Sequence, residues 1–309
     1  MNINNIQTII DSYAQSLSGK FGVFFKDLNT GVSCGTNINE VFPTASMAKV
    51  YILAELYKLA YEGKIDLDQR LEFKASNKSA GSGVLSELTP GFSLTIRDYA
   101  LLMMNISDNA AADICYHLTG SGNIEKDILI PFKLEKTQIN MDFRTMLNVY
   151  CGVPEDTEPD DFQSAIDKKY KDEPSFTLRN YRPYIETLEH DDVTSPKDLG
   201  SFFEILYKGQ WVNEDVSEQI IDVMKKCQTN SRIPKLLPPG VAVTHKTGSM
   251  DKLANDGGIV YTRKGDYILI MMYNANTADE AEYKNNKKGS YSDSALANMS
   301  LEIFKEYIH

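Results

Sequence analysis

Apolar residues recur at helical spacing through the first twenty residues of the chain, which predicts an amphipathic helix there. The apolar face of this helix comprises Ile6, Ile9, Ile10, Tyr13 and Leu17. The pattern then changes to that of a strand over 21–28, and Asn29-Thr30-Gly31 is typical of a turn into a second strand. The chain is therefore expected to begin with a helix and a strand pair.

The middle of the chain is dominated by helical patterns. One helix is expected from Ser46 to about Glu62, closed by Gly63. Further helices are expected over 95–105, 109–118, 122–129 and 196–207. A polar stretch over about 140–195, rich in Asp, Glu, Pro and Tyr, has weak periodicity, so a long loop and a partly helical insertion both remain open.

The last third of the chain returns to strand patterns, over 241–247, 257–262 and 267–274, with a hairpin turn at 263–266 and a final helix over about 292–307. Because strands lie at both ends with helices between them, we expect an α/β plus all-α fold. One antiparallel sheet would be built from both termini and flanked by helices. Residues 1–309 would form one unit, with an α/β lobe over about 1–63 and 213–309 and a helical lobe over about 64–212.

Composition excludes several classes of function. A net charge of −11 over 309 residues disfavours nucleic-acid and anionic-membrane surfaces, which need basic patches. No stretch is long and apolar enough to cross a bilayer, and the first residues lack the pattern of a signal peptide. We expect a monomer without nucleic-acid or membrane partners. Its expected location is cytoplasmic, or extracytoplasmic if a signal sequence has been removed.

The four cysteines and four histidines are widely spaced along the chain. Neither set shows metal-ligand spacing, so we expect no metal and no cofactor, and we expect the cysteines to be reduced packing residues. The scarcity of histidine also disfavours a Ser-His-Asp triad, which needs a well-placed imidazole.

The first candidate for chemistry is Ser46-Met47-Ala48-Lys49. A serine at a helix start has its own N–H pointing outward beside the positive end of the helix dipole. Lys49 lies on the same face one turn on, and its amine could accept the Ser46 proton if its pKa is lowered. The pattern alone is weak, because Ser249-Met250-Asp251-Lys252 also fits it, and a capping serine beside an exposed lysine explains a lone match.

Two further motifs follow in the chain. Ser107-Asp108-Asn109 lies between two expected helices, where it could face a cleft or simply cap the second helix. Lys246-Thr247-Gly248, followed by Ser249, ends an expected strand. On an edge strand it offers a cation, a hydroxyl and an approachable backbone, which suit a carboxylate and an amide. A solvated lysine at an ordinary strand end is the alternative.

The three motifs together, in the order S-x-x-K, S-D-N and K-T-G, resemble those of the class A β-lactamases and penicillin-binding proteins. The resemblance extends to SGVLSELTPG before the second motif, Val193-Thr194-Ser195-Pro196, Arg232-Ile233-Pro234 and NDGGIVYT after the third. It covers nearly the whole chain apart from about 140–190. It implies a β-lactamase-like fold with the site between two lobes, and a small β-lactam or peptide-like substrate.

The resemblance also implies a role for each matched residue. Ser46 would attack the carbonyl carbon, Lys49 would take or relay its proton, and Ser107 would pass a proton to the departing nitrogen. Asn109 would orient Lys49 and the substrate amide. The residues that would hold the substrate carboxylate are Lys246, Thr247, Ser249 and, fourteen residues before Lys246, Arg232. The N–H groups of Ser46 and Ser249 would form the oxyanion hole.

One departure from the family pattern concerns deacylation. Class A enzymes use a loop glutamate in a pattern resembling E-x-x-L-N, and that pattern does not occur between 130 and 195. The candidates for the missing base that lie in this region are Glu155, Glu158, Glu173, Glu186 and Glu189. The leading expectation is a β-lactam-hydrolysing serine enzyme. The alternatives are a penicillin-binding-protein-like peptidase or esterase with slow deacylation, and a non-catalytic penicillin-binding or sensor module.

Overall fold

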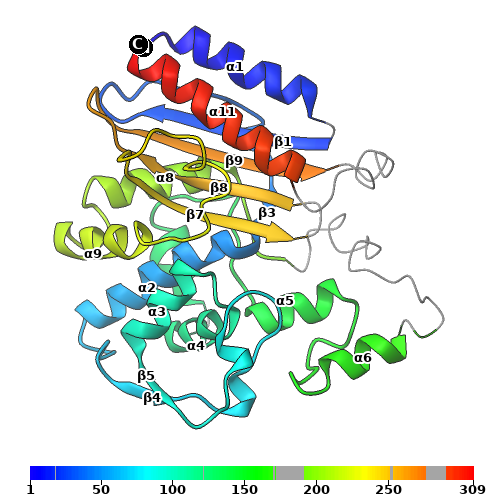
Figure 1. The fold of residues 1–309 in the computed structure, drawn as a ribbon. Coiled ribbons are helices and arrows are strands. Elements are labelled where there is room, and N and C mark those ends of the chain that lie inside the picture. Colours follow the sequence, from blue (N-terminus) through cyan, green and yellow to red (C-terminus); the bar gives the residue numbers. More distant parts are fainter. Residues whose placement is uncertain (18, 121, 170, 172–190, 251–252, 276–289) are drawn as a thin grey trace. The chain divides into compact units, whose positions relative to one another are not determined.

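The computed structural model describes residues 1–309 except 18, 121, 170, 172–190, 251–252 and 276–289 (Figure 1). Its strands are β1 Gly19–Asp27, β2 Ser33–Thr36, β3 Phe42–Pro43, β4 Arg70–Glu72, β5 Ser93–Thr95, β6 Val193–Thr194, β7 Val243–Met250, β8 Leu253–Val260 and β9 Tyr267–Ala275. Its α-helices are α1 Ile3–Ser16, α2 Lys49–Tyr61, α3 Ile96–Asn105, α4 Asn109–Thr119, α5 Phe143–Tyr150, α6 Phe162–Lys169, α8 Pro196–Tyr207, α9 Glu214–Met224 and α11 Ser290–Ile308. Short 3₁₀ turns are η1 Ala45–Ala48, η2 Ala75–Asn77 and η3 Leu85–Glu87, and η4 Glu125–Leu129 is a π-helix.

The main sheet has the strand order β2-β1-β9-β8-β7, and every neighbouring pair is antiparallel. The first long strand pairs with the last, so that Phe24 lies opposite Ile270. The predicted sheet built from both ends of the chain is thereby confirmed. Strand β7, which carries the K-T-G motif, is an edge strand of this sheet.

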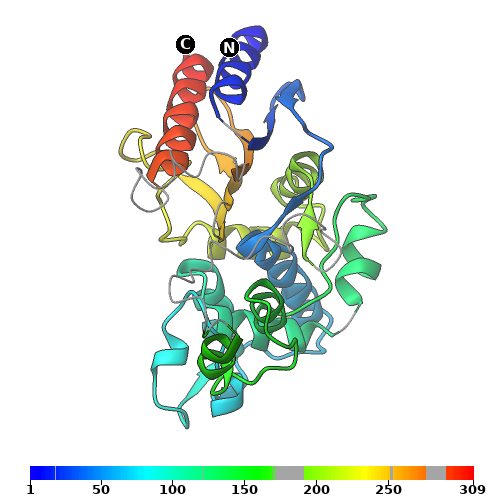
Figure 2. The same cartoon turned by 90° about the vertical axis from the view of Figure 1, so that its right-hand side faces the viewer.

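Successive side chains of a strand point to opposite faces of the sheet, so both faces have apolar side chains to bury. Different helices cover the two faces. Val23 and Phe25 of β1 belong to the core formed with α1 and α11, which lie side by side on that face (Figures 1 and 2). Phe24 points the other way, toward Gly200 of α8. The apolar face predicted for the first helix is confirmed, with Ile6 and Ile10 fully buried.

The chain divides into two compact units. The first, here called the sheet unit, comprises Met1–Met47, Leu134–Thr137 and Val193–His309. The second, called the helical unit, comprises Ala48–Lys133 and Gln138–Asp192. These bounds differ from those of the expected lobes, because α2 packs with α3 and α4 whereas α8 packs on β1 and β9.

Local structure departs from the expected elements in three places. The segment from Ser46 begins as the 3₁₀ turn η1 before continuing as α2, and the expected helix over 122–129 is mostly the π-helix η4. The described part of 140–195 contains α5 and α6, so it is partly helical. No helix among the described residues is long and apolar enough to cross a membrane.

Candidate active site

Ser46 lies in the turn η1 of the sheet unit, and it is half-buried between fully buried neighbours, Ala45 and Met47. Ala45 has a φ of 46°, a left-handed conformation that is unfavourable for a residue with a Cβ. Such strain persists only where surrounding contacts impose it, and it concentrates at functional sites. Of these three side chains, that of Ser46 is therefore the one that solvent can reach.

The contacts that impose this conformation come from β7 and β8. Asn255 of β8 donates from Nδ2 to the Pro43 carbonyl oxygen at 2.9 Å. Gly248 of β7 lies so close that a Cβ there would overlap the Thr44 carbonyl oxygen and lie 3.1 Å from Cγ of Met47. The glycine of the K-T-G motif is therefore required by the close approach of β7 to the turn that carries Ser46.

Lys49, the first residue of α2, is fully buried in the helical unit. Its Nζ donates to the Ser107 carbonyl oxygen at 2.7 Å, to Oγ of Ser107 at 3.0 Å and to Oδ1 of Asn109 at 2.8 Å. It also lies 4.3 Å from the ring centroid of Phe143, within range of a cation–π interaction. The structure thus brings three of the predicted residues together around one ammonium group.

The S-D-N junction has the geometry of a helix cap as well as that of a site. Ser107 has a φ of 59°, and Asp108 caps α4 by accepting from the N–H of Ala111 at 2.9 Å. The other Asp108 carboxylate oxygen accepts from the N–H of Leu85 at 2.9 Å, and a Cβ at Gly83 would overlap it. The cap and the functional interpretation are compatible, because Asp108 holds the turn while its neighbours contact Lys49.

Sequence reasoning missed other residues around Lys49. Oγ of Ser82 donates to the Ser107 carbonyl oxygen at 2.6 Å and lies 3.2 Å from Oδ1 of Asn109. The buried carboxyl of Asp113 accepts from the N–H of Phe143 at 2.6 Å, and burial raises its pKa to about 7. Ser82 belongs to the SGV segment that matched the family framework, whereas nothing in the sequence marks Asp113 or Phe143.

The K-T-G motif lies on β7 with its lysine inside and Ser249 outside. Lys246 is fully buried, and its Nζ donates to the Thr247 carbonyl oxygen at 2.9 Å. Burial lowers the pKa of Lys246 to about 8. Ser249 is exposed. Because β7 is at an edge of the sheet, its outer backbone groups can pair with an extended ligand.

Arg232 is buried beneath this strand. Its Nε donates to Asp293 at 2.6 Å, and its terminal nitrogens donate to the Asn255 carbonyl oxygen at 2.6 Å and to Oγ of Ser249 at 2.7 Å. A terminal nitrogen of Arg232 also donates to the Gly248 carbonyl oxygen at 3.1 Å. These contacts favour Arg232 as a support of Ser249 and Gly248 over direct recognition of a carboxylate.

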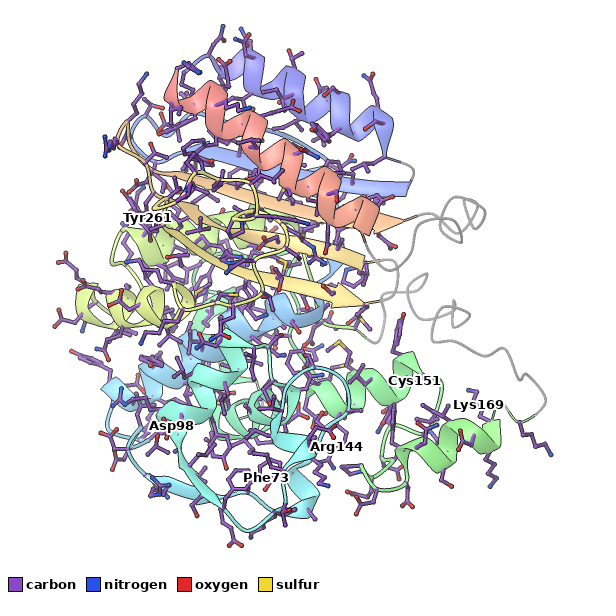
Figure 3. The ribbon with its side chains drawn as sticks, in the orientation of Figure 1. Phe73, Asp98, Arg144, Cys151, Lys169 and Tyr261 are labelled. Atoms are coloured by element: carbon purple, nitrogen blue, oxygen red, sulfur yellow. The ribbon has the colours of Figure 1, made fainter. Side chains whose placement is uncertain are left out.

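Two of the five candidate glutamates lie in the described part of the chain, and both are at the surface. Glu155 is exposed, and Glu158 accepts from Arg144 of α5 at 3.2 Å. Arg144 is labelled in Figure 3. Glu173, Glu186 and Glu189 lie outside the described residues. Within the described ranges, no group of three His, Cys, Asp or Glu side chains could hold a metal ion.

The sheet is built from both ends of the chain, and its edge strand carries the K-T-G motif. The serine lies in a strained turn, and a buried lysine begins the next helix. Together these features define a serine hydrolase of the penicillin-recognising class. The model of the β-lactamase enzyme family matches residues 3–305, and the chain belongs to that family. An imipenem-hydrolysing β-lactamase of Enterobacter cloacae is 22% identical over 303 residues, which are 96% of this chain and 88% of the relative.

Solved structures show the same fold. The crystal structure of a β-lactamase from Sphaerobacter thermophilus superposes with a TM-score of 0.77 at 18% identity, covering 99% of this chain and 98% of the other. The structure of PBP-A superposes with a TM-score of 0.74 at 22% identity, covering 99% and 96%. The predicted family and fold class are confirmed.

Proposed function

We propose that the protein hydrolyses β-lactams through an acyl-enzyme formed on Ser46. The observation that carries this proposal is the buried Lys49 ammonium, which donates hydrogen bonds to Ser107 and Asn109. Lys49 follows Ser46 by three residues in the sequence, and Ser46 is half-buried beside the strained Ala45. Burial of a cation is costly unless polar groups satisfy it, as three oxygen acceptors do here, and an amine at this spacing can serve the serine hydroxyl.

The proposed reaction begins with the loss of the Ser46 proton. Each of the three Lys49 protons has an oxygen acceptor, so Lys49 must first lose one proton to solvent before it can accept that of Ser46. The Ser107 hydroxyl, 3.0 Å away, offers the route. Oγ of Ser46 then attacks the carbonyl carbon, the ring C–N bond breaks, and the nitrogen receives its proton through Ser107. Water finally cleaves the ester and regenerates Ser46.

The remaining roles concern the substrate. Lys246 and Thr247 would bind its carboxylate, and the N–H groups of Ser46 and Ser249 would stabilise the oxyanion. Gly248 would let the strand approach the turn, and Arg232 would position Ser249. The substrate class is a small β-lactam or peptide-like molecule, and we propose that the chain acts as a monomer, which light scattering on the purified protein tests.

Covalent labelling tests the nucleophile. Intact mass spectrometry after benzylpenicillin treatment should show one adduct, because ring opening leaves the whole molecule on the enzyme. Ser46→Ala should abolish the adduct. Ser249→Ala is the matched control, because Ser249 begins the other S-x-x-K match, and it should retain the adduct. An adduct that persists in Ser46→Ala, or that maps to Ser249, would contradict the assignment of Ser46 as the nucleophile.

A slowly deacylating, penicillin-binding-protein-like enzyme is the second candidate function. It is favoured by the absence of the E-x-x-L-N pattern between 130 and 195, since a base for hydrolysis must activate water beside the ester. We expect a pre-steady-state burst with a chromogenic β-lactam, followed by slow turnover. Fast turnover without a burst contradicts rate-limiting deacylation, and the absence of any reaction supports a non-catalytic module.

The deacylation base can be found by substitution. Replacing each of the five glutamates by Gln and following decay of the acyl-enzyme mass should trap the ester in one variant. We expect this variant to be Glu186→Gln or Glu189→Gln, because these residues lie nearest in sequence to α8. Equal decay in all five variants would show that the base is another residue.

A further inference from the structure

Cys227, His245 and Asp256 form a buried polar cluster in the sheet unit that the proposed reaction does not use. Nδ1 of His245 lies 2.9 Å from Oδ1 of Asp256, and its Nε2 lies 3.0 Å from Oδ1 of Asn230. The Cys227 thiol lies close enough to the same His245 for the imidazole to lower the pKa of the thiol. A thiol, an imidazole and a carboxylate in sequence are the arrangement that activates a cysteine.

Charge in this cluster favours the thiolate. Both ring nitrogens of His245 face oxygen atoms, as expected for an imidazolium. Burial acts to lower the pKa of His245, but the charge and hydrogen bond of Asp256 outweigh it and raise the pKa. Burial acts to raise the pKa of Cys227, but His245 and then Lys246 outweigh it and lower the pKa.

A second set of contacts links the thiol to the proposed substrate strand. Oγ1 of Thr229 lies 3.1 Å from Sγ of Cys227 and 2.8 Å from Oγ1 of Thr247. Thr247 belongs to the K-T-G motif of β7. An oxygen added to the Cys227 sulfur on this side would displace the Thr229 hydroxyl, because that hydroxyl is already in contact with the sulfur.

We propose that Cys227 is a peroxide-sensitive thiol whose oxidation to sulfenic acid weakens substrate binding through Thr229 and Thr247. The effect on substrate rests on the proposed function, whereas the oxidation does not. In the reaction the thiolate attacks one oxygen of hydrogen peroxide, the O–O bond breaks and an S–O bond forms. Sulfur loses two electrons, and the second oxygen leaves as hydroxide and takes a proton from the His245 imidazolium to give water.

The size of the preference follows from a comparison with Cys34, which is half-buried on β2. Burial raises the pKa of Cys34 to about 11, whereas that of Cys227 is lowered to about 7. At pH 7.5 the thiolate fractions then differ by about three orders of magnitude, and the weaker nucleophilicity of the more acidic thiol removes about two of them. We expect Cys227 to be oxidised about tenfold faster than Cys34.

Mass spectrometry measures the oxidation directly. The native protein is treated with hydrogen peroxide at pH 7.5, quenched, and unfolded in dimedone, so that sulfenic acid is trapped without access to the folded interior. The adduct should map to Cys227 about tenfold more often than to Cys34. Equal labelling of the two cysteines, or labelling of Cys34 first, overturns the reactive thiol.

Kinetics measure the consequence. Peroxide should raise KM for a chromogenic cephalosporin about fivefold or more, with a smaller change for its carboxylate ester, and a thiol reductant should reverse the effect. Cys227→Ser should keep its activity under peroxide, and Cys227→Ala serves if the serine variant does not fold. An unchanged KM in fully oxidised protein overturns the link to Thr247. If untreated protein forms no acyl-enzyme, the proposed function fails, while the labelling result stands by itself.

Discussion

The close approach of Gly248 to the Ser46 turn leads to a sharp prediction for Gly248→Ala. The added methyl group would overlap the Thr44 carbonyl oxygen and contact Ala45 at 3.4 Å, so the turn must move. Restoring an ordinary carbon–oxygen separation requires a displacement of about 1 Å. Neither the Thr44 backbone nor the β7 backbone can yield as a flexible side chain would.

A displacement of this size near a nucleophile slows a reaction on the order of a hundredfold, because attack depends on the position of the hydroxyl. The same overlap should cost about 1–3 kcal/mol of the free energy of unfolding. Stopped-flow acylation with a chromogenic β-lactam measures the first effect, and urea unfolding measures the second.

The matched control is Gly200→Ala on α8, in the same unit. Its methyl group would overlap the ring of Phe24 and lie 3.4 Å from Ile270, which costs stability without touching the Ser46 turn. We expect acylation within about twofold of the unmodified protein in this control. Acylation by Gly248→Ala at near the unmodified rate, or an equal loss in both variants, would refute the reasoning.

Three further outcomes are expected. Lys49→Ala should slow acylation about 10²- to 10⁴-fold, whereas Lys246→Ala should mainly raise KM for carboxylate-bearing β-lactams; equal losses on an esterified substrate would contradict this division. Because the pKa of Lys246 is lowered to about 8, kcat/KM should fall above that pH, and the fall should be absent in an active Lys246→Arg variant. The pKa of His245 is raised from 6.5 to about 10 by folding, so its stabilising contribution is complete below pH 6.5 and is lost as pH rises toward 10. Urea midpoints should therefore fall over this range, less steeply in His245→Gln, and parallel slopes would argue against a charged His245.

The sequence predicts an element best where local signals agree. The helix expected over 196–207 is found at Pro196–Tyr207, because Ser195 caps it and proline occupies its first turn. The strand expected from 257 begins instead at Leu253. Asn255 and Asp256 obscure its start, since both polar side chains are buried against partners from distant segments, and such partners are invisible in a periodic pattern.

The same limit applies to the candidate site. Ser46, Lys49, Ser107 and Lys246 could be named because each belongs to a short motif with its own spacing. Asp113 and Phe143 could not, because they reach Lys49 through the packing of α5 on α4. The carboxylate-binding role that the family resemblance implies for Arg232 depends on its spacing from Lys246, and its hydrogen bonds to Asp293 and Ser249 favour a supporting role.

The pairing of β1 with β9 has a consequence for how the chain acquires its structure during synthesis. Phe24 must wait for Ile270 before it has a neighbour on that side, so the central strand pair cannot form until most of the chain has been made. Contacts between residues so far apart in sequence slow folding, because a long loop must close first. The apolar residues of α1 and β1 are exposed during this interval, so a chaperone that covers the first thirty residues should raise the yield of folded protein more than one that covers the helices in the middle.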